Sequence, residues 1–172
     1  MAGSLIKIDE EIVTSAVASV TLTGIDSTYD VYMVRTNNVT FDTDNVDFAV
    51  RVTTGGTAQT DANYDRATKL LRTASFLNIG STNTTNFETE GGGGNAANEQ
   101  SNNIFYCFNF NNASEYSFCT VETSQVNLNS QLGGQQGGFV KTTAEANDGL
   151  HFFVSSGNID TGSSFVLYGL AK

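Results

Sequence analysis

Apolar and polar residues alternate along much of the chain, and this period of two restricts its fold more than any other feature. The clearest case is VDFAVRVTTGG (46–56), in which every second residue from Val46 to Val52 is apolar before a Gly-Gly turn. Successive side chains of a β-strand point to opposite faces, so this pattern predicts a strand with one buried face. Similar patterns or apolar runs predict strands in seven further segments: 19–25, 29–36, 103–110, 115–123, 137–143, 150–156 and 163–170.

The alternation also predicts which side chains share a face. In the segment YDVYMVRT (29–36), Tyr29, Val31 and Met33 fall on one face and Tyr32 on the opposite one. In the last segment, residues 165 and 167 fall on one side and residues 166 and 168 on the other, and we expect this strand to be part of the core.

Two segments depart from simple alternation. NIFYCFNF (103–110) is an almost continuous apolar run, which predicts a strand buried on both faces. DANYDRATKLLRTA (61–74) spaces its apolar residues as a helix does, and fits either a short helix or a strand that continues through 68–79. Every neighbouring segment is predicted to be β, so a loop followed by a strand is favoured.

Two polar, glycine-containing segments interrupt the strands. Residues 80–103 include four consecutive glycines, and residues 130–138 contain two Gly-Gly pairs. Both are predicted to be surface loops, serving either as binding elements or as tolerated excursions. The candidates for stacking on sugars are the aromatic side chains Tyr29, Tyr32, Tyr106, Tyr116 and Phe87. Aromatics at period two are typical of a core, and only Phe87, in the first loop, is expected to face solvent.

The composition supports an all-β chain. Proline and tryptophan are absent, while threonine and aromatic residues, which suit strands, accompany asparagine and glycine, which suit turns. A length of 172 residues fits one domain with a sizeable core. We therefore expect an all-β fold over 1–172: a single-domain, jelly-roll-like antiparallel β-sandwich with little or no helix and a polar glycine-rich loop at 80–103.

The charge balance limits the classes of partner. Lysine and arginine are outnumbered by aspartate and glutamate, giving a net charge of -10, which argues against nucleic acid or an anionic membrane surface. The chain has no apolar run of about 18 residues, as a membrane-spanning helix requires. Its start, MAGSLIKIDEEIV, does not resemble a signal peptide, so synthesis in a cytoplasm is expected.

The sequence shows no pattern typical of a catalytic site. His151, the single histidine, stands beside two phenylalanines in a predicted strand, where a structural role is expected. The glycine run is followed by NAANEQ rather than by the Gly-Lys-Ser/Thr of a phosphate-binding loop. We therefore predict a protein that is not an enzyme, with no catalytic or cofactor-binding residues, no cofactor, and binding residues that remain unassigned.

The acidic cluster DTDNVD is a candidate calcium site, because hard oxygen ligands suit that ion. It contains Asp42, Asp44, Asn45 and Asp47. The spacing departs from the EF-hand pattern, and residues of this type also form turns by bonding to their own backbone. A turn, rather than a dedicated metal site, is predicted.

The two cysteines, Cys107 and Cys119, lie twelve residues apart in a predicted hairpin. They are expected to be buried reduced thiols, although a disulfide would follow if the strands paired in that register.

Three segments resemble structural proteins of tailed, especially marine, bacteriophages: VTLTGIDSTYDVYMV (20–34), DNVDFAVRVTTGGTAQTDANYD (44–65) and LHFFVSSGNIDTGSSFVLYGLAK (150–172). Many such proteins end in a similar Ser-Gly-Asn turn followed by a strand with Leu-Tyr-Gly. The resemblance implies a jelly-roll-like β-sandwich exposed on the virion, and it brings no catalytic residues.

Two functions follow from this resemblance as hypotheses. The first is a capsid decoration or cement protein, a homo-oligomer, with a trimer favoured, that binds the major capsid protein or other virion proteins on the particle surface. The second is a tail fibre or receptor-binding module that uses loops 80–103 and 130–138 to recognise host surface glycans.

Overall fold

The computed structural model describes residues 4–89 and 92–171. Within these ranges the protein is all-β, without a helix, as the period of two predicts. The strands are β1 Leu5–Ile12, β2 Ser19–Thr23, β3 Val31–Val39, β4 Phe48–Thr54, β5 Thr57–Ala58, β6 Tyr64–Arg72, β7 Ser75–Thr84, β8 Phe87–Glu88, β9 Ser101–Phe108, β10 Ser117–Val126, β11 Leu132–Lys141, β12 Gly149–Val154 and β13 Ser164–Leu170.

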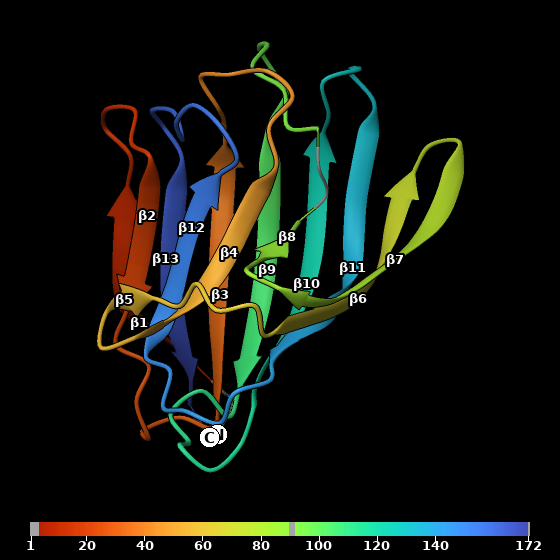
Figure 1. Cartoon of the computed structure of the whole chain (residues 1–172). Coiled ribbons are helices and arrows are strands. Elements are labelled where there is room, and N and C mark those ends of the chain that lie inside the picture. The colour runs from red at the N-terminus through yellow and green to blue at the C-terminus, as the bar shows by residue number, and fades with distance from the viewer. Residues whose placement is uncertain (1–3, 90–91, 172) are drawn as a thin grey trace.

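The strands form two antiparallel sheets that face each other in a single sandwich (Figure 1). The larger sheet has eight strands in the order β1-β13-β3-β9-β10-β11-β6-β7, and the smaller has five, β2-β12-β4-β5 with β8 paired to β4. From β1 to β4 each successive strand crosses to the other sheet, and β8-β9 and β12-β13 do the same. This alternation is compatible with a jelly roll, which stays a prediction.

The core lies between the sheets and is centred on aromatic rings from both. Phe48 of β4 stacks on Phe152 of β12 with ring centroids 5.8 Å apart. Phe152 in turn lies 5.2 Å from Phe165 of β13 and 5.7 Å from Phe105 of β9, in the opposite sheet. Burial of these rings removes a large apolar area from water, which is the main force that holds the two layers together.

The last strand is confirmed as part of the core. β13 lies between β1 and β3, so both ends of the described chain are paired within the larger sheet. Phe165 and Leu167 belong to the core cluster, whereas Val166 and Tyr168 point to the other face, as predicted. The predicted buried face of 46–52 is confirmed as well.

The predicted loop 80–103 is wrong at both ends and at 87–88, whereas residue 89 and residues 92–100 lie outside the strands. β7 continues to Thr84, β8 pairs with β4, and β9 begins at Ser101; residues 90 and 91 lie outside the described residues. Phe87 was expected to face solvent, but it is 0% exposed and stacks on Phe139 at a centroid distance of 4.6 Å. One apolar residue in a polar segment is enough to anchor a short strand when a cavity in the core accepts it.

The predicted loop 130–138 is also wrong, because residues from Leu132 onward form β11. A Cβ atom at Gly134 would lie 2.5 Å from the carbonyl oxygen of Thr123, and one at Gly138 would clash with the carbonyl oxygen of Cys119. The backbone of β11 approaches β10 so closely that only glycine fits at these two positions.

Segment 61–74 is a strand rather than a helix, but the strand ends at Arg72 instead of continuing through 68–79. A two-residue turn follows, and β7 runs back along β6 as its hairpin partner. The helical spacing had no effect because β11 on one side and β7 on the other supply the backbone hydrogen bonds. Tertiary pairing therefore overrode a weak local pattern.

Strands β3 and β9 both carry apolar residues on two faces. In β3 the core side carries Tyr32 and Val34, and Val31 and Met33 share the opposite face, the grouping that alternation predicts; Tyr29, predicted to join Val31 and Met33, packs against the core instead. In β9 the prediction of burial on both faces is wrong, because alternate residues are buried and the opposite face is only half-buried. In both strands, therefore, apolar side chains lie on the outer face of the larger sheet.

Candidate binding surface

The outer face, defined as the side of the eight-stranded sheet that points away from the smaller sheet, has an apolar centre. Strand register places its side chains in rows that cross the strands. Two adjacent rows form what we call the aromatic band: Val31, Phe108, Phe118 and Val140 in one row, and Tyr168, Met33 and Tyr106 in the next.

The aromatic band is partly open to solvent. Phe118 is 44% exposed, and its neighbours Phe108, Tyr106 and Tyr168 are half-buried. Large contiguous apolar areas are uncommon on soluble monomers, so this face is a candidate interaction surface. No strand of the smaller sheet covers it, because that sheet packs on the opposite side (Figure 1).

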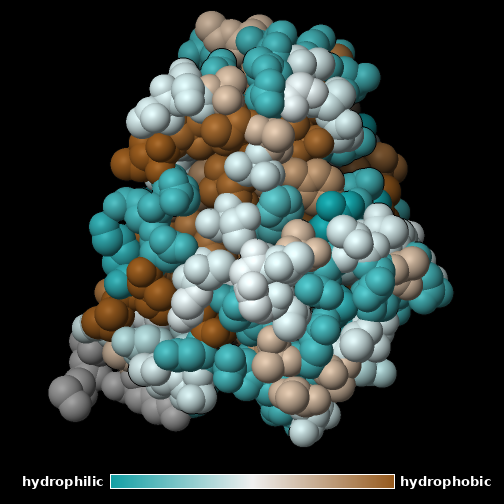
Figure 2. Space-filling model, turned by 60° about the vertical axis from the view of Figure 1, so that its left-hand side comes forward, coloured by the Kyte–Doolittle hydropathy of each residue, from teal (hydrophilic) through white to brown (hydrophobic). Residues whose placement is uncertain are grey.

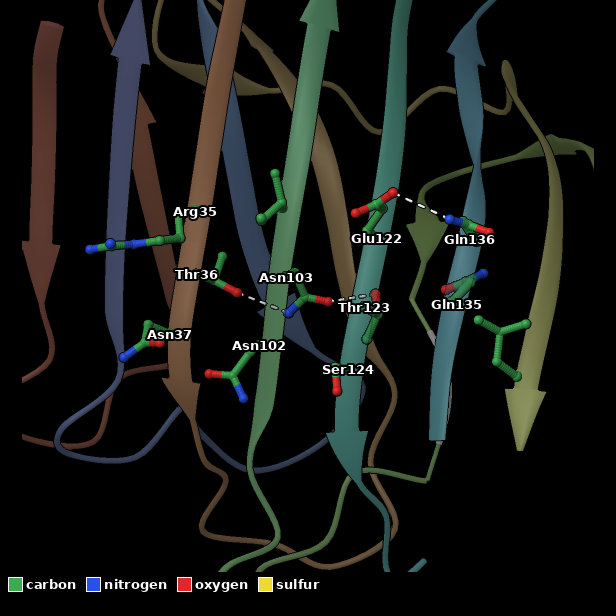
Figure 3. Close-up of a pocket in the computed structure, with 12 residues that line it drawn as sticks. Arg35, Thr36, Asn37, Asn102, Asn103, Glu122, Thr123, Ser124, Gln135 and Gln136 are labelled. Carbon is green, nitrogen blue, oxygen red and sulfur yellow. Dashed lines mark hydrogen bonds between the residues drawn. The ribbon is translucent and has the colours of Figure 1, made fainter. Parts of the chain in front are cut away.

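A charged row borders the band. Arg35, Ile104, Glu122, Gln136 and Lys69 follow one another across β3, β9, β10, β11 and β6. The Nε2 of Gln136 donates a hydrogen bond to Glu122 at 3.2 Å. Figure 3 views this row from the outer face, with the side chains of Arg35, Glu122 and Gln136 lying over the sheet.

The outer face has two hollows, one at the charged row and one next to Phe118. A groove of about 430 Å³ is lined by the charged row from Arg35 to Gln136 together with Asn37, Asn102 and Ser124 (Figure 3). A second hollow, of about 350 Å³, lies next to Phe118 and is bordered by Ala67, Thr120, Gly138 and Val140; we call it the Phe118 hollow. Gly138 of β11 contributes to the Phe118 hollow, because an outward position without a side chain leaves a trough between the neighbouring strands.

A buried hydrogen-bond chain supports the groove from below. The Nδ2 of Asn103 donates to Thr36 Oγ1 at 2.8 Å, and Thr123 Oγ1 donates to Asn103 Oδ1 at 2.7 Å (Figure 3). On the next pair of strands, Gln135 Nε2 donates to Thr68 Oγ1 at 2.7 Å. The hydrogen bonds of Asn103 join β3, β9 and β10 below the groove, whereas Oε1 of Gln135 is buried without a hydrogen-bond partner.

The edge strand β1 has a different kind of apolar surface. Leu5, Ile6 and Ile12 are exposed, and Figure 2, which brings this side of the molecule forward, shows apolar surface broken up by polar residues. Lys7 and Glu10 form an ion pair of 2.7 Å on the same strand. Charges on an edge strand oppose pairing with another chain, so this edge is a weaker binding candidate than the aromatic band.

His151 lies outside this surface, on the outer side of the smaller sheet. Its Nδ1 hydrogen-bonds to Thr21 Oγ1 at 2.8 Å, and its ring stacks on Phe153. The guanidinium of Arg51 covers the other part of Phe153, 4.2 Å from the ring centroid. Burial, followed by the charge of Arg51, lowers the pKa of His151, and these contacts agree with the predicted structural role.

The acidic cluster forms a turn. Asp42 accepts hydrogen bonds from the backbone and the side chain of Asn158, both at 2.7 Å, and these bonds lower the pKa of its carboxyl group. Asn45 has a positive φ of 58°, and Asp47 shares hydrogen bonds with Ser155. In the described part of the chain, no three His, Cys, Asp or Glu side chains gather as metal ligands would.

The cysteines pair directly across β9 and β10, in the register that the disulfide alternative required. Both are free buried thiols, and the two sulfur atoms lie 3.4 Å apart. Burial raises the pKa of Cys119, with a further contribution from its contact with Cys107, so the thiol form of Cys119 dominates.

The aromatic candidates named from the sequence are dispersed. Tyr32 is buried, with its hydroxyl hydrogen-bonded to Asp26, and Phe87 is in the core; Tyr29 packs against the core, and Tyr116 is exposed just before β10 begins. Only Tyr106 belongs to the band. The band residues that sequence reasoning missed, above all Phe118 and Phe108, carried one available signal: apolar residues on both faces of 103–110 and at 118.

A scan of the chain against models of known protein families finds no match, and a search of curated proteins finds no relative. Across 4–89 and 92–171, no helix is long and apolar enough to cross a membrane.

Proposed function

We propose that the protein is a structural protein of a bacteriophage virion, most specifically a decoration or cement protein that stabilises the capsid from outside. In this proposal it is made in the host cytoplasm and assembles as a homo-oligomer, with a trimer favoured. It binds the major capsid protein or other virion proteins on the particle surface, and it acts by binding without turnover, with neither nucleic acid nor membrane as a partner.

The observation that carries the proposal is the aromatic band. A rigid β-sandwich with an apolar face, rather than a deep cleft, is suited to packing against another protein, here a second copy within the homo-oligomer, which leaves its other faces for the capsid. Repeated contacts on a symmetric particle act together, so even modest single contacts give stable attachment. The virion is proposed as the location because residues 20–34, 44–65 and 150–172 resemble phage structural proteins.

The acidic character of the chain supports the same proposal. A net charge of -10 disfavours binding to the packaged DNA and to host nucleic acid, so assembly in a cytoplasm proceeds without a competing polyanion.

The test uses purified protein and emptied or expanded capsids. We expect many copies to bind each capsid, and capsids without the protein to burst at lower temperature or lower internal pressure, with adsorption to host cells unchanged. Unchanged capsid stability, together with no binding of the purified protein, would refute the decoration role.

The alternative is a tail fibre or receptor-binding module for host glycans. Its original basis, loops 80–103 and 130–138, is weakened because much of both segments is strand. One observation still favours it: the groove of Figure 3 combines amides with Arg35 and Glu122, groups that hydrogen-bond to sugar hydroxyls. If removal of the protein abolishes adsorption and leaves capsid stability unchanged, this alternative is correct.

A further inference from the structure

We propose that a second copy of this chain covers the aromatic band, with Phe118 of each subunit inserted into the Phe118 hollow of its neighbour. The inference deepens the homo-oligomer part of the proposed function, and it assigns that contact to one face and one side chain.

The first argument is shape. Phe118 is the most exposed side chain of the band, and the hollow beside it is bordered by the small residues Ala67, Thr120 and Gly138. A projecting ring and a depression therefore occur side by side on one face. Rotational symmetry brings the projection of one copy over the depression of another, and closed rings of two or three copies satisfy both in every subunit.

The second argument is charge. Strand register places three cations on the outer face, Lys7, Arg35 and Lys69, and three carboxylates, Glu10, Asp65 and Glu122. The face is therefore neutral although the whole chain has a net charge of -10. Two strongly acidic molecules repel each other over most of their surfaces, so a neutral apolar face is the one on which copies approach without that cost.

The third argument is size. The band and the charged row from Arg35 to Gln136 cross five strands, β13, β3, β9, β10 and β11. At about 4.8 Å per strand and about 6.8 Å per row, three rows cover roughly 500 Å² in projection. Side-chain relief adds accessible area, which brings the face toward the roughly 800 Å² per partner of a specific protein interface.

The experiment measures the oligomeric state of the full chain by sedimentation over a wide concentration range. We compare the wild-type protein with two variants, which we call the band variants. Phe118→Ser removes the projection, and Ala67→Phe fills the hollow beside the band from an exposed position. Phe76→Ser is the matched control, because Phe76 is 68% exposed on the β6–β7 hairpin, outside the band. Circular dichroism checks that each variant is folded.

We expect a closed wild-type oligomer. Each of the two band variants should raise the dissociation constant at least about tenfold, as is usual for a central interface residue. The control should leave the constant unchanged. A third variant, Arg35→Glu, makes the face acidic and should weaken association in a salt-dependent way. A monomeric wild-type protein, or folded band variants that associate as the wild type does, would overturn the inference.

The oligomer experiment and the capsid-binding experiment can fail independently of each other. A wild-type oligomer that depends on Phe118 but does not bind capsids leaves the inference intact and refutes the decoration role. A wild-type monomer that binds capsids in many copies does the reverse.

Discussion

Replacement of Phe87 with alanine tests whether a polar segment of the chain is anchored in the core. Phe87 has no solvent exposure, its strand pairs with β4, and its ring stacks on Phe139 with centroids 4.6 Å apart. Truncation of a buried phenylalanine to alanine costs about 3–5 kcal/mol in unfolding free energy. Loss of an aromatic pair contributes about 0.5–1.5 kcal/mol beyond the buried area, so we expect the upper half of that range.

For a chain of 172 residues, each kcal/mol corresponds to roughly 2–4 °C in melting temperature, so the variant should melt about 8–20 °C below the wild type. The assay is urea unfolding at fixed protein concentration, together with a thermal melt followed by circular dichroism. Phe76→Ala, at the exposed end of the adjacent hairpin, is the control and should change stability by less than about 0.5 kcal/mol. If the two variants unfold alike, Phe87 is a surface residue and the reasoning is refuted.

Three further predictions concern other parts of the fold. Deletion of 163–172 removes β13 from between β1 and β3, so the product should be unfolded or insoluble, and a soluble product with an unchanged melting temperature would contradict this. Replacement of Cys107 and Cys119 together with alanine should leave a folded protein with a modest loss of stability; a wild-type mass two hydrogens light in fresh lysate would show a disulfide instead. The pKa of His151 is lowered in the folded state, so its neutral form contributes stability that is complete above the unfolded value of about 6.5 and is lost as pH falls through the folded pKa. The unfolding free energy of the wild type should therefore drop more than that of His151→Gln between pH 7.5 and pH 5, and parallel curves would contradict the assignment.

Much of the architecture was predictable because alternation is a local property. A strand turns each successive side chain to the opposite face, so the pattern of 46–52 specified both the strand and its buried side. The same applies to 163–170, where Phe165 and Leu167 reach the core as predicted. The all-β class and the pairing of the last strand required no knowledge of distant contacts.

The location of the binding surface was not predictable in this way. Segments 29–36 and 103–110 have apolar residues on both faces, and alternation alone gives no means to decide which face enters the core. The decision depends on which side the smaller sheet covers. Because that sheet packs against Tyr32 and Phe105, the opposite face with Met33 and Tyr106 is left at the surface.

The polar segments show the complementary limit. Glycine is depleted in strands, so 130–138 resembles a loop until β10 lies close enough that its carbonyl oxygens exclude a Cβ atom at Gly134 and Gly138. Phe87 likewise looks exposed until Phe139 and β4 surround it. The sequence by itself determined which residues alternate and therefore that the chain forms strands. Only the tertiary structure decided which face is buried where both are apolar, and which positions tolerate nothing but glycine, because both depend on atoms supplied by strands far away in the chain.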